Sequence, residues 1–238
     1  MNKDLTQLEK CLDVKFTNTN LLRQAVVHRS FINEHRDFPL DHNERLEFLG
    51  DAVLELIVTE HLFNSYPNPE GELTNWRASL VNAQMLALVA EQLGIEQFLY
   101  LSRGEEKDTN SKARQSILAN CVEAIIGAIY LDKDYDTTAT FIHKNIISKL
   151  PHILRYKLYL DAKSRFQEAA QELMGVTPTY RVLKESGPDH DKEFIVGVFL
   201  QNEQVAAGEG RSKQEAQMKA AEAGLEVKGW LQFEHPAK

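Results

Sequence analysis

Cysteine and long apolar runs are what this sequence most clearly lacks. Its two cysteines, Cys11 and Cys121, stand far apart, and neither has a second Cys or a His at metal-ligand spacing. This excludes a disulfide framework and gives no indication of a zinc site. No run of 18 apolar residues occurs, and the N-terminus lacks the apolar segment of a signal peptide. We therefore expect a cytoplasmic protein with no membrane partner.

Basic residues are also in the minority. The 27 Lys and Arg residues are outnumbered by 35 Asp and Glu, which gives a net charge of −8. Residues 1–160 hold 17 basic and 22 acidic residues (−5), and residues 161–238 hold 10 and 13 (−3). Proteins that bind nucleic acid are commonly basic, so the overall charge argues mildly against such a partner. The local placement of the basic residues must therefore decide whether the chain binds nucleic acid.

Apolar periodicity divides the chain into two parts near residue 150. Before this point apolar residues recur at helical spacing. Asn18 and Thr74 are candidate helix caps, residues 67–71 are expected to form a loop, and Pro151 is expected to close the last long helix. The expected helices cover residues 5–12, 21–27, 46–63, 80–93, 117–131 and 139–150.

After residue 160 the pattern changes to a mixture of helices and strands. Amphipathic segments predict a helix at each end, and alternating apolar residues between them predict strands. A turn-rich loop is expected over residues 186–191. The expected elements are a helix over 163–174, strands over 179–184, 193–200 and 204–208, and a helix over 212–227.

These patterns predict two domains of different class. An all-α domain should cover residues 1–151, followed by a linker over residues 152–160. A small α+β domain with the order α-β-β-β-α should cover residues 161–229, and residues 230–238 should form a tail.

A stripe of acidic residues marks the helix expected over residues 46–63. Glu44, Glu47, Asp51 and Glu55 fall on one side of that helix, roughly opposite its apolar face. Carboxylates at this spacing repel one another, and no Lys or Arg lies within the stripe to relieve them. Oxygen ligands suit Mg²⁺ or Mn²⁺, so we interpret the stripe as part of a divalent-metal site. The alternative is a solvated acidic face.

A further carboxylate stands in a helix that is apolar nearly all round. Glu123 lies within residues 117–131, where the other acid is the near-terminal Asp132. A buried carboxylate is costly unless something compensates it, so we expect a metal ion or, alternatively, a structural salt bridge to an arginine. Asn120, three residues earlier, shares its face and can offer Mg²⁺ a neutral, weaker oxygen ligand.

Five segments together resemble the ribonuclease III family over nearly the whole chain. The strongest is His-Asn-Glu-Arg-Leu-Glu-Phe-Leu-Gly-Asp at residues 42–51, which is similar to the family signature nearly letter for letter. The C-terminal α-β-β-β-α unit, ending in Gly-Glu-Gly-Arg-Ser-Lys-Gln-Glu-Ala, resembles a double-stranded-RNA-binding domain. The remaining matches are residues 28–30, residues 70–74 with Arg77, and residues 125–132.

The resemblance implies an endonuclease that cleaves double-stranded RNA with Mg²⁺, for which Mn²⁺ can substitute. It implies 5′-phosphate and 3′-hydroxyl ends, short 3′ overhangs and a homodimer with one site per strand. Glu47, Asp51 and Glu123 would be catalytic and, with Asn120, would hold the metal. The family usually has Asp where this chain has Asn120, and this difference predicts weaker metal binding.

The same resemblance assigns supporting roles. Glu44 and Glu70 would contact RNA or cross the dimer interface. Phe48 would be a plug between subunits, with an ordinary core aromatic as the alternative.

For the second domain, Ser212 and Glu215 form a capping box, and the helix N-terminus with its basic residues favours phosphate. Gln214 stands where the family often has a second lysine, so we expect phosphate affinity to be lower than usual. The residues expected to contact RNA, with plain surface positions as the alternative, are Gln167, Glu168, His190, Arg211, Ser212 and Lys213.

Two competing functions remain open. The first is a double-stranded-RNA-binding protein whose cleavage is impaired because Asn120 replaces Asp. A catalytic site that had lost its activity should also have lost several of its acids. Five acids remain, which argues against this function. The second is an unrelated metal-dependent hydrolase of small diphosphates, which would have no use for an RNA-binding domain.

Overall fold

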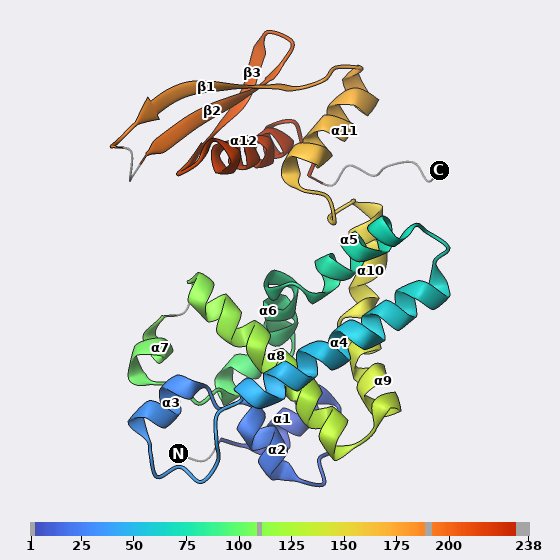
Figure 1. Ribbon diagram of the computed structural model, residues 1–238, viewed down its shortest axis with the longest axis vertical. Helices are drawn as coiled ribbons and strands as arrows, with labels where there is room; N and C mark the ends of the chain where they lie inside the picture. The colour runs from blue at the N-terminus through green and yellow to red at the C-terminus, as the bar shows by residue number, and fades with distance from the viewer. Residues whose placement is uncertain (1–2, 109–110, 189–191, 232–238) are drawn as a thin grey trace. The chain divides into compact units, whose positions relative to one another are not determined.

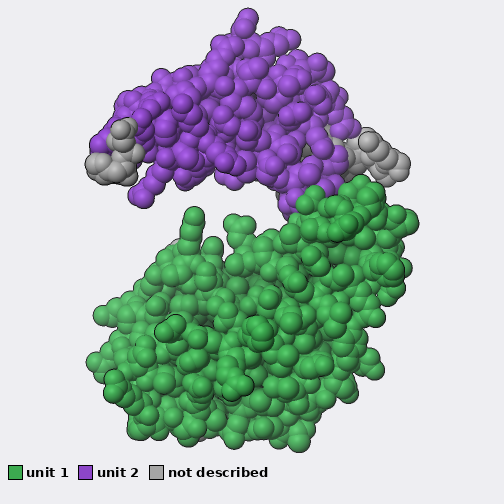
Figure 2. All heavy atoms as spheres, viewed as in Figure 1, with its two compact units in different colours: residues 1–151 green, residues 152–238 purple. Residues whose placement is uncertain are grey.

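The computed structural model describes residues 3–108, 111–188 and 192–231. The chain divides into two compact units, residues 1–151 and residues 152–238 (Figure 2). Each unit is described by itself below. In the described part of the chain, no helix is long and apolar enough to cross a membrane.

The first unit is helical, as the apolar periodicity predicts (Figure 1). Single 3₁₀ turns follow its sixth and ninth helices, at Ile95–Phe98 and Ile147–Lys149. The tenth helix spans the boundary between the units. The helices are α1 (Leu5–Leu12), α2 (Thr19–Ala25), α3 (Arg29–Glu34), α4 (Glu44–Ser65), α5 (Glu70–Val81), α6 (Ala83–Gln92), α7 (Arg103–Lys107), α8 (Lys112–Asp132), α9 (Tyr135–Asn145) and α10 (Leu150–Arg155).

Helix α8 forms the centre of the first unit. Every residue from Ala124 to Ile129 is buried, because α4 and α6 pack against this helix from different sides and α2 contacts it as well. A helix apolar nearly all round is expected in such a position. The prediction of an apolar helix over residues 117–131 is therefore confirmed, with the helix extending further at its N-terminal end.

Three local predictions are wrong. Residues 80–93 are not one helix, because α5 ends at Val81 and the Asn82 side chain caps α6 by accepting from the backbone N–H of Met85 at 2.9 Å. Thr74 is no cap, since it lies inside α5, which begins after Pro69. Pro151 does not close a helix but lies in the first turn of α10, where proline is tolerated. The prediction that Asn18 caps a helix is confirmed at α2.

The second unit has the predicted order α-β-β-β-α. Its three strands form one antiparallel sheet in the order β1-β2-β3. Helix α12 packs against β3 and β2, and α11 packs against α12. The bounds are α11 (Ala162–Met174), β1 (Thr179–Ser186), β2 (Glu193–Leu200), β3 (Glu203–Gly210) and α12 (Lys213–Val227).

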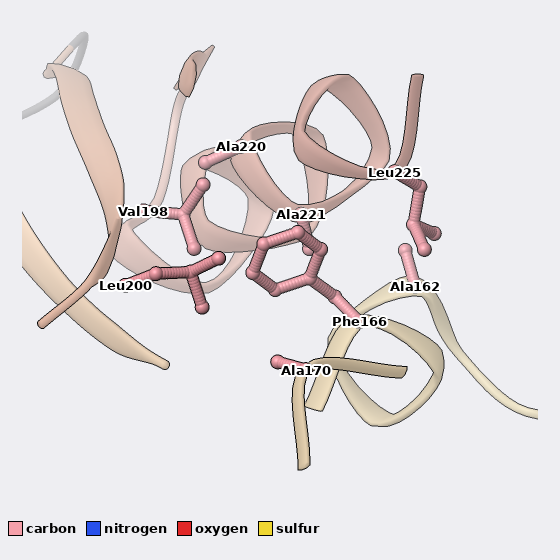
Figure 3. Packing of buried hydrophobic residues seen from close by; sticks show 8 residues of the cluster. All are labelled: Ala162, Phe166, Ala170, Val198, Leu200, Ala220, Ala221 and Leu225. Atoms are coloured by element: carbon pink, nitrogen blue, oxygen red, sulfur yellow. The ribbon is translucent and has the colours of Figure 1, made fainter. Parts of the chain in front are cut away.

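Phe166 of α11 is fully buried at the centre of the second core. Figure 3 shows its ring between the side chains of α12 and those of the sheet. Small residues let the helix lie close to the strands: a Cβ at Gly208 would stand 2.2 Å from the backbone nitrogen of Ala220. Burying a phenylalanine side chain contributes about 2–3 kcal/mol, so this ring is a major source of stability for the unit.

Candidate functional site

Helices α4 and α8 touch backbone to backbone through two glycines. A Cβ at Gly50 would lie 1.7 Å from the carbonyl oxygen of Glu123, and a Cβ at Gly127 would lie 2.3 Å from that of Leu46. No other residue type fits at such a crossing. Neither glycine has a role predicted from the sequence, although a glycine within an apolar helical pattern is itself a signal of close packing.

This crossing brings together the acids predicted from two distant segments. Asp51 is exposed at the edge of the crossing, and Glu47 on α4 and Glu123 on α8 are half-buried. Burial, followed by the negative charges of Asp51 and Glu47, raises the pKa of Glu123 to about 7. Burial also raises the pKa of Glu47, with the charge of Glu44 adding to the effect. The three carboxylates are therefore close enough to interact electrostatically.

Asn120 belongs to the same cluster. Its side chain hydrogen-bonds the carboxylate of Glu47, which partly offsets the rise in the pKa of that group. An asparagine can donate this bond through its amide nitrogen, whereas an ionised aspartate has no proton to donate. The residue that departs from the family pattern thus contacts a predicted ligand and adds no negative charge.

The side-chain types of this cluster fit a hard cation. In the structure, however, the three carboxylates and the Asn120 amide do not surround a single point. Three carboxylate groups and an amide offer only oxygen ligands, which suit Mg²⁺ and Mn²⁺. None of the ion pairs found in the described part of the chain includes Glu47, Asp51 or Glu123. Within the same residues, no group of three His, Cys, Asp or Glu side chains stands ready to hold a metal ion.

Glu44, whose charge acts on Glu47, also has a basic partner of its own. Arg29 of α3 lies 3.3 Å from one of its oxygens, and the ring of His42 lies 3.7 Å from the other. No Lys or Arg lies within the stripe itself, as predicted, but α3 supplies Glu44 with an arginine. Glu55 is exposed on α4.

A buried polar contact fixes the start of α4 beside α8. Asn43 is 3% exposed, and its side chain donates to the carbonyl oxygen of Ala25 at 3.1 Å. The thiol of Cys121 lies 3.6 Å from the same oxygen. The end of α2 thus holds both helices that carry the acids. Asn43 is a positioning residue within the signature that sequence reasoning did not identify.

Glu70 lies elsewhere, as the first residue of α5. It is exposed, and it is not among the charges that shift the pKa of Glu47 or Glu123. It lines a cavity of about 600 Å³ together with Phe63 and Arg77. Within one chain, the structure therefore does not join this predicted residue to the acid cluster.

Helix α4 also carries an exposed apolar stripe. Phe48 is 83% exposed, Leu56 58% and Phe63 77%, and their spacing places them within one side of the helix. A second cavity, of about 760 Å³, is lined by Phe48, Leu131 and neighbouring residues. The alternative that Phe48 is an ordinary core aromatic is wrong, since its ring lies outside the core.

In the second unit, Ser212 caps α12 as predicted, and the return bond of Glu215 reaches the residue before the cap. The hydroxyl of Ser212 accepts from the backbone N–H of Glu215 at 3.1 Å, and the Glu215 carboxylate accepts from that of Arg211 at 2.9 Å. The ammonium of Lys213 lies 5.5 Å from the centre of the Phe194 ring. These contacts place two basic residues at the N-terminus of α12, where phosphate is favoured.

The other residues expected to contact RNA lie on α11 or beyond the described chain. Gln167 is exposed, and Glu168 is half-buried in an ion pair with Lys157. His190 lies outside the described residues.

Comparisons with known proteins agree with this two-part organisation. A family model described as Ribonuclease-III-like matches residues 18–150, and one described as double-stranded RNA binding motif matches residues 162–228. A Ribonuclease 3 of Natranaerobius thermophilus is 46% identical over 220 residues, which are 92% of this chain and 94% of that protein. A Ribonuclease 3 of Nitratiruptor sp. is 42% identical over 226 residues, covering 94% and 97%.

Among solved structures, the nuclease domain of ribonuclease III from Campylobacter jejuni is similar to the first unit. It is 39% identical, with a TM-score of 0.55, and the match covers 62% of this chain and 99% of that one. That structure is described for flexibility in a region involved in dimer formation.

Proposed function

Because this chain belongs to the ribonuclease III family, we propose that it hydrolyses double-stranded RNA at a divalent-metal centre on α4 and α8. The observation that carries the proposal is the meeting of Glu47, Asp51 and Glu123 at one helix crossing. These acids share no ion pair with a base in the described chain, and the same chain carries a double-stranded-RNA-binding motif. Holding like charges together in this way is costly, and a cation offsets the cost.

Each residue of the cluster has a role that follows from its position. Glu47 and Glu123 would bind Mg²⁺ or Mn²⁺ directly, and Asp51 and Asn120 would complete the shell through oxygen or water. When bound, the metal neutralises charge on the scissile phosphate and makes water nucleophilic at neutral pH. The pKa of Glu123 near 7 belongs to the metal-free protein, and a bound cation would hold this carboxylate in its ionised form. Asn120 orients Glu47 through their hydrogen bond.

Recognition of RNA belongs to the second unit. Modules of this kind read the shape, 2′-hydroxyls and phosphates of a duplex over about 16 base pairs. Arg211 and Lys213 would bind phosphate at the start of α12, and Gln167 and Glu168 would face the minor groove. We further infer products with 5′-phosphate and 3′-hydroxyl ends and short 3′ overhangs, in the processing of ribosomal and messenger RNA precursors.

A homodimer would supply one site for each strand. Its support is the exposed stripe of Phe48, Leu56 and Phe63, since soluble monomers rarely leave three large apolar side chains on one helix face. In that dimer Phe48 would enter a cavity of the partner subunit. Glu70, remote from the acid cluster of its own chain, would then serve the site of the other subunit.

One observation favours a second candidate, a duplex-binding protein with impaired cleavage. Asn120 removes one negative charge from the cluster and already bonds Glu47, so metal affinity should be lower than with four carboxylates.

The test is incubation of the purified protein with a perfect RNA duplex of about 30 base pairs, long enough for two such modules. We expect cleavage with Mg²⁺ and with Mn²⁺, and none with EDTA. Glu123→Ala should bind the duplex as the parent does and leave it intact. Binding without cleavage under every condition would establish the second candidate, and cleavage by Glu123→Ala would refute the assignment of the site.

A further inference from the structure

The chain forms a tight turn at Lys157, between α10 and α11. This residue has a φ of 48°, in the left-handed region that lysine rarely adopts. The turn is closed by bonds from the backbone N–H of Leu158 to the carbonyl oxygen of Ile153 at 3.0 Å, and from Leu160 to Lys157 at 3.0 Å. Glycine would adopt this backbone conformation without strain. The presence of lysine at this left-handed position is therefore explained best by a role of its side chain.

That side chain reaches helix α11. The ammonium of Lys157 lies 2.5 Å from Oε2 of Glu168, and both groups are partly shielded from solvent. Glu168 is one of the residues proposed to face the minor groove of the RNA. A carboxylate can accept several hydrogen bonds, so an ion pair at Oε2 leaves Oε1 able to accept another.

We propose that Lys157 is a positioning residue for RNA recognition, which holds Glu168 so that its free oxygen accepts a hydrogen bond from a 2′-hydroxyl. This inference rests on the proposed function. It makes Lys157, which precedes α11, part of the RNA-binding surface. It also predicts that the ion pair of Lys157 with Glu168 influences which nucleic acid is bound. DNA has no 2′-hydroxyl, so the pair should favour RNA over DNA.

Charge supports the same role. The second half of the chain carries a net charge of −3, and a carboxylate without a partner would be repelled by the phosphates on either side of the groove. The ammonium of Lys157 offsets the charge of Glu168 while leaving it a hydrogen-bond acceptor. A direct contact of Lys157 with phosphate is the competing explanation, and it predicts no preference for RNA.

The experiment measures binding of the full chain, without divalent metal, to an RNA duplex and to a DNA duplex of equal sequence. Lys157→Met keeps most of the stem and removes the charge. We expect it to weaken RNA binding about fivefold, as for the loss of one hydrogen bond, and to leave DNA binding unchanged. Lys157→Arg should restore RNA binding, and Lys157→Gly should weaken it although its backbone is relieved of strain.

A double-mutant cycle with Glu168→Gln decides how Lys157 acts. If Lys157 acts through Glu168, Lys157→Met has no further effect on RNA binding in the Glu168→Gln background. Equal losses for RNA and DNA that persist in that background would overturn the proposal in favour of a direct phosphate contact. Unchanged RNA binding by Lys157→Met would overturn it as well. Failure of the parent protein to bind duplex RNA would refute the proposed function itself.

Discussion

Gly50→Ala should disrupt the crossing on which the site depends. The added methyl would stand 1.7 Å from the carbonyl oxygen of Glu123 and 2.9 Å from the backbone nitrogen of Gly127. Both are main-chain atoms, so no side chain can rotate away, and α4 and α8 must separate by more than an ångström. Overpacking a core costs about 1–3 kcal/mol even where side chains can adjust. We therefore expect a loss of about 3 kcal/mol or more in the free energy of unfolding of the first unit.

Gly71→Ala provides the matched control. Gly71 also lies in a helix, α5, but nothing stands within 4 Å of the position its Cβ would take. There alanine should be tolerated and should stabilise the protein slightly, because Gly71 lies in the first turn of α5, where helix propensity counts for less than in the interior. A propensity gain at least as large applies at Gly50, so the difference between the two variants sets a lower limit on the steric cost.

Urea unfolding followed by fluorescence measures both variants. The tryptophans are Trp76 in the first unit and Trp230 in the second, so a Trp230→Phe background makes the signal report the first unit. Gly50→Ala should lower the unfolding midpoint while Gly71→Ala raises it slightly. If Gly50→Ala were as stable as the parent, the backbone contact between α4 and α8 would not exist in solution.

Three further predictions concern the acid cluster and the exposed stripe. The folded pKa of Glu123, about 7, exceeds its ordinary 4.5, so the contribution of this group to metal-free stability should be greatest below pH 4.5 and be lost as the pH rises through 7. Glu123→Gln should remove this fall. At pH 8 its free energy of unfolding in urea should exceed that of the parent by about 1–2 kcal/mol, after allowance for partial solvent access. If there were no gain, the charge of Glu123 would not be buried. Asn120→Asp should lower the melting temperature without metal and raise the affinity for Mg²⁺ in calorimetry, and unchanged values for both would remove residue 120 from the site. Phe48→Ala should weaken self-association in sedimentation by about 2 kcal/mol or more, while Leu88→Ala, an exposed leucine on α6, should not.

Much of the fold could be predicted because local patterns decide it. Helix α8 is apolar on nearly every side, and this can be read directly from its sequence. Strand β2 is marked by its run of apolar residues, and Ser212 caps α12 as its sequence predicts. Predictions failed where a single residue had to divide or start a helix. Asn82 separates α5 from α6 in the middle of a continuous apolar pattern, and Pro69 starts α5 earlier than expected.

The site was predictable in composition but not in geometry. Sequence spacing places Glu47 and Asp51 on one helix face, and the burial cost of Glu123 signals a partner. The ion pair of Arg29 with Glu44, and the bond of Asn120 to Glu47, join residues from different helices. Such contacts depend on how helices pack, which one sequence does not state. The backbone approach at Gly50 and Gly127 is what brings these groups together.

The most direct test of the account is calorimetric binding of Mn²⁺ to the full chain and to single variants of α4 and α8. We predict that Glu47→Gln and Glu123→Gln each lose the site bound by the parent. Glu55→Gln, on the same helix as Glu47 but with no assigned role, should bind Mn²⁺ as the parent does. Equal binding by all three variants would contradict the claim that the crossing of α4 and α8 is the metal centre.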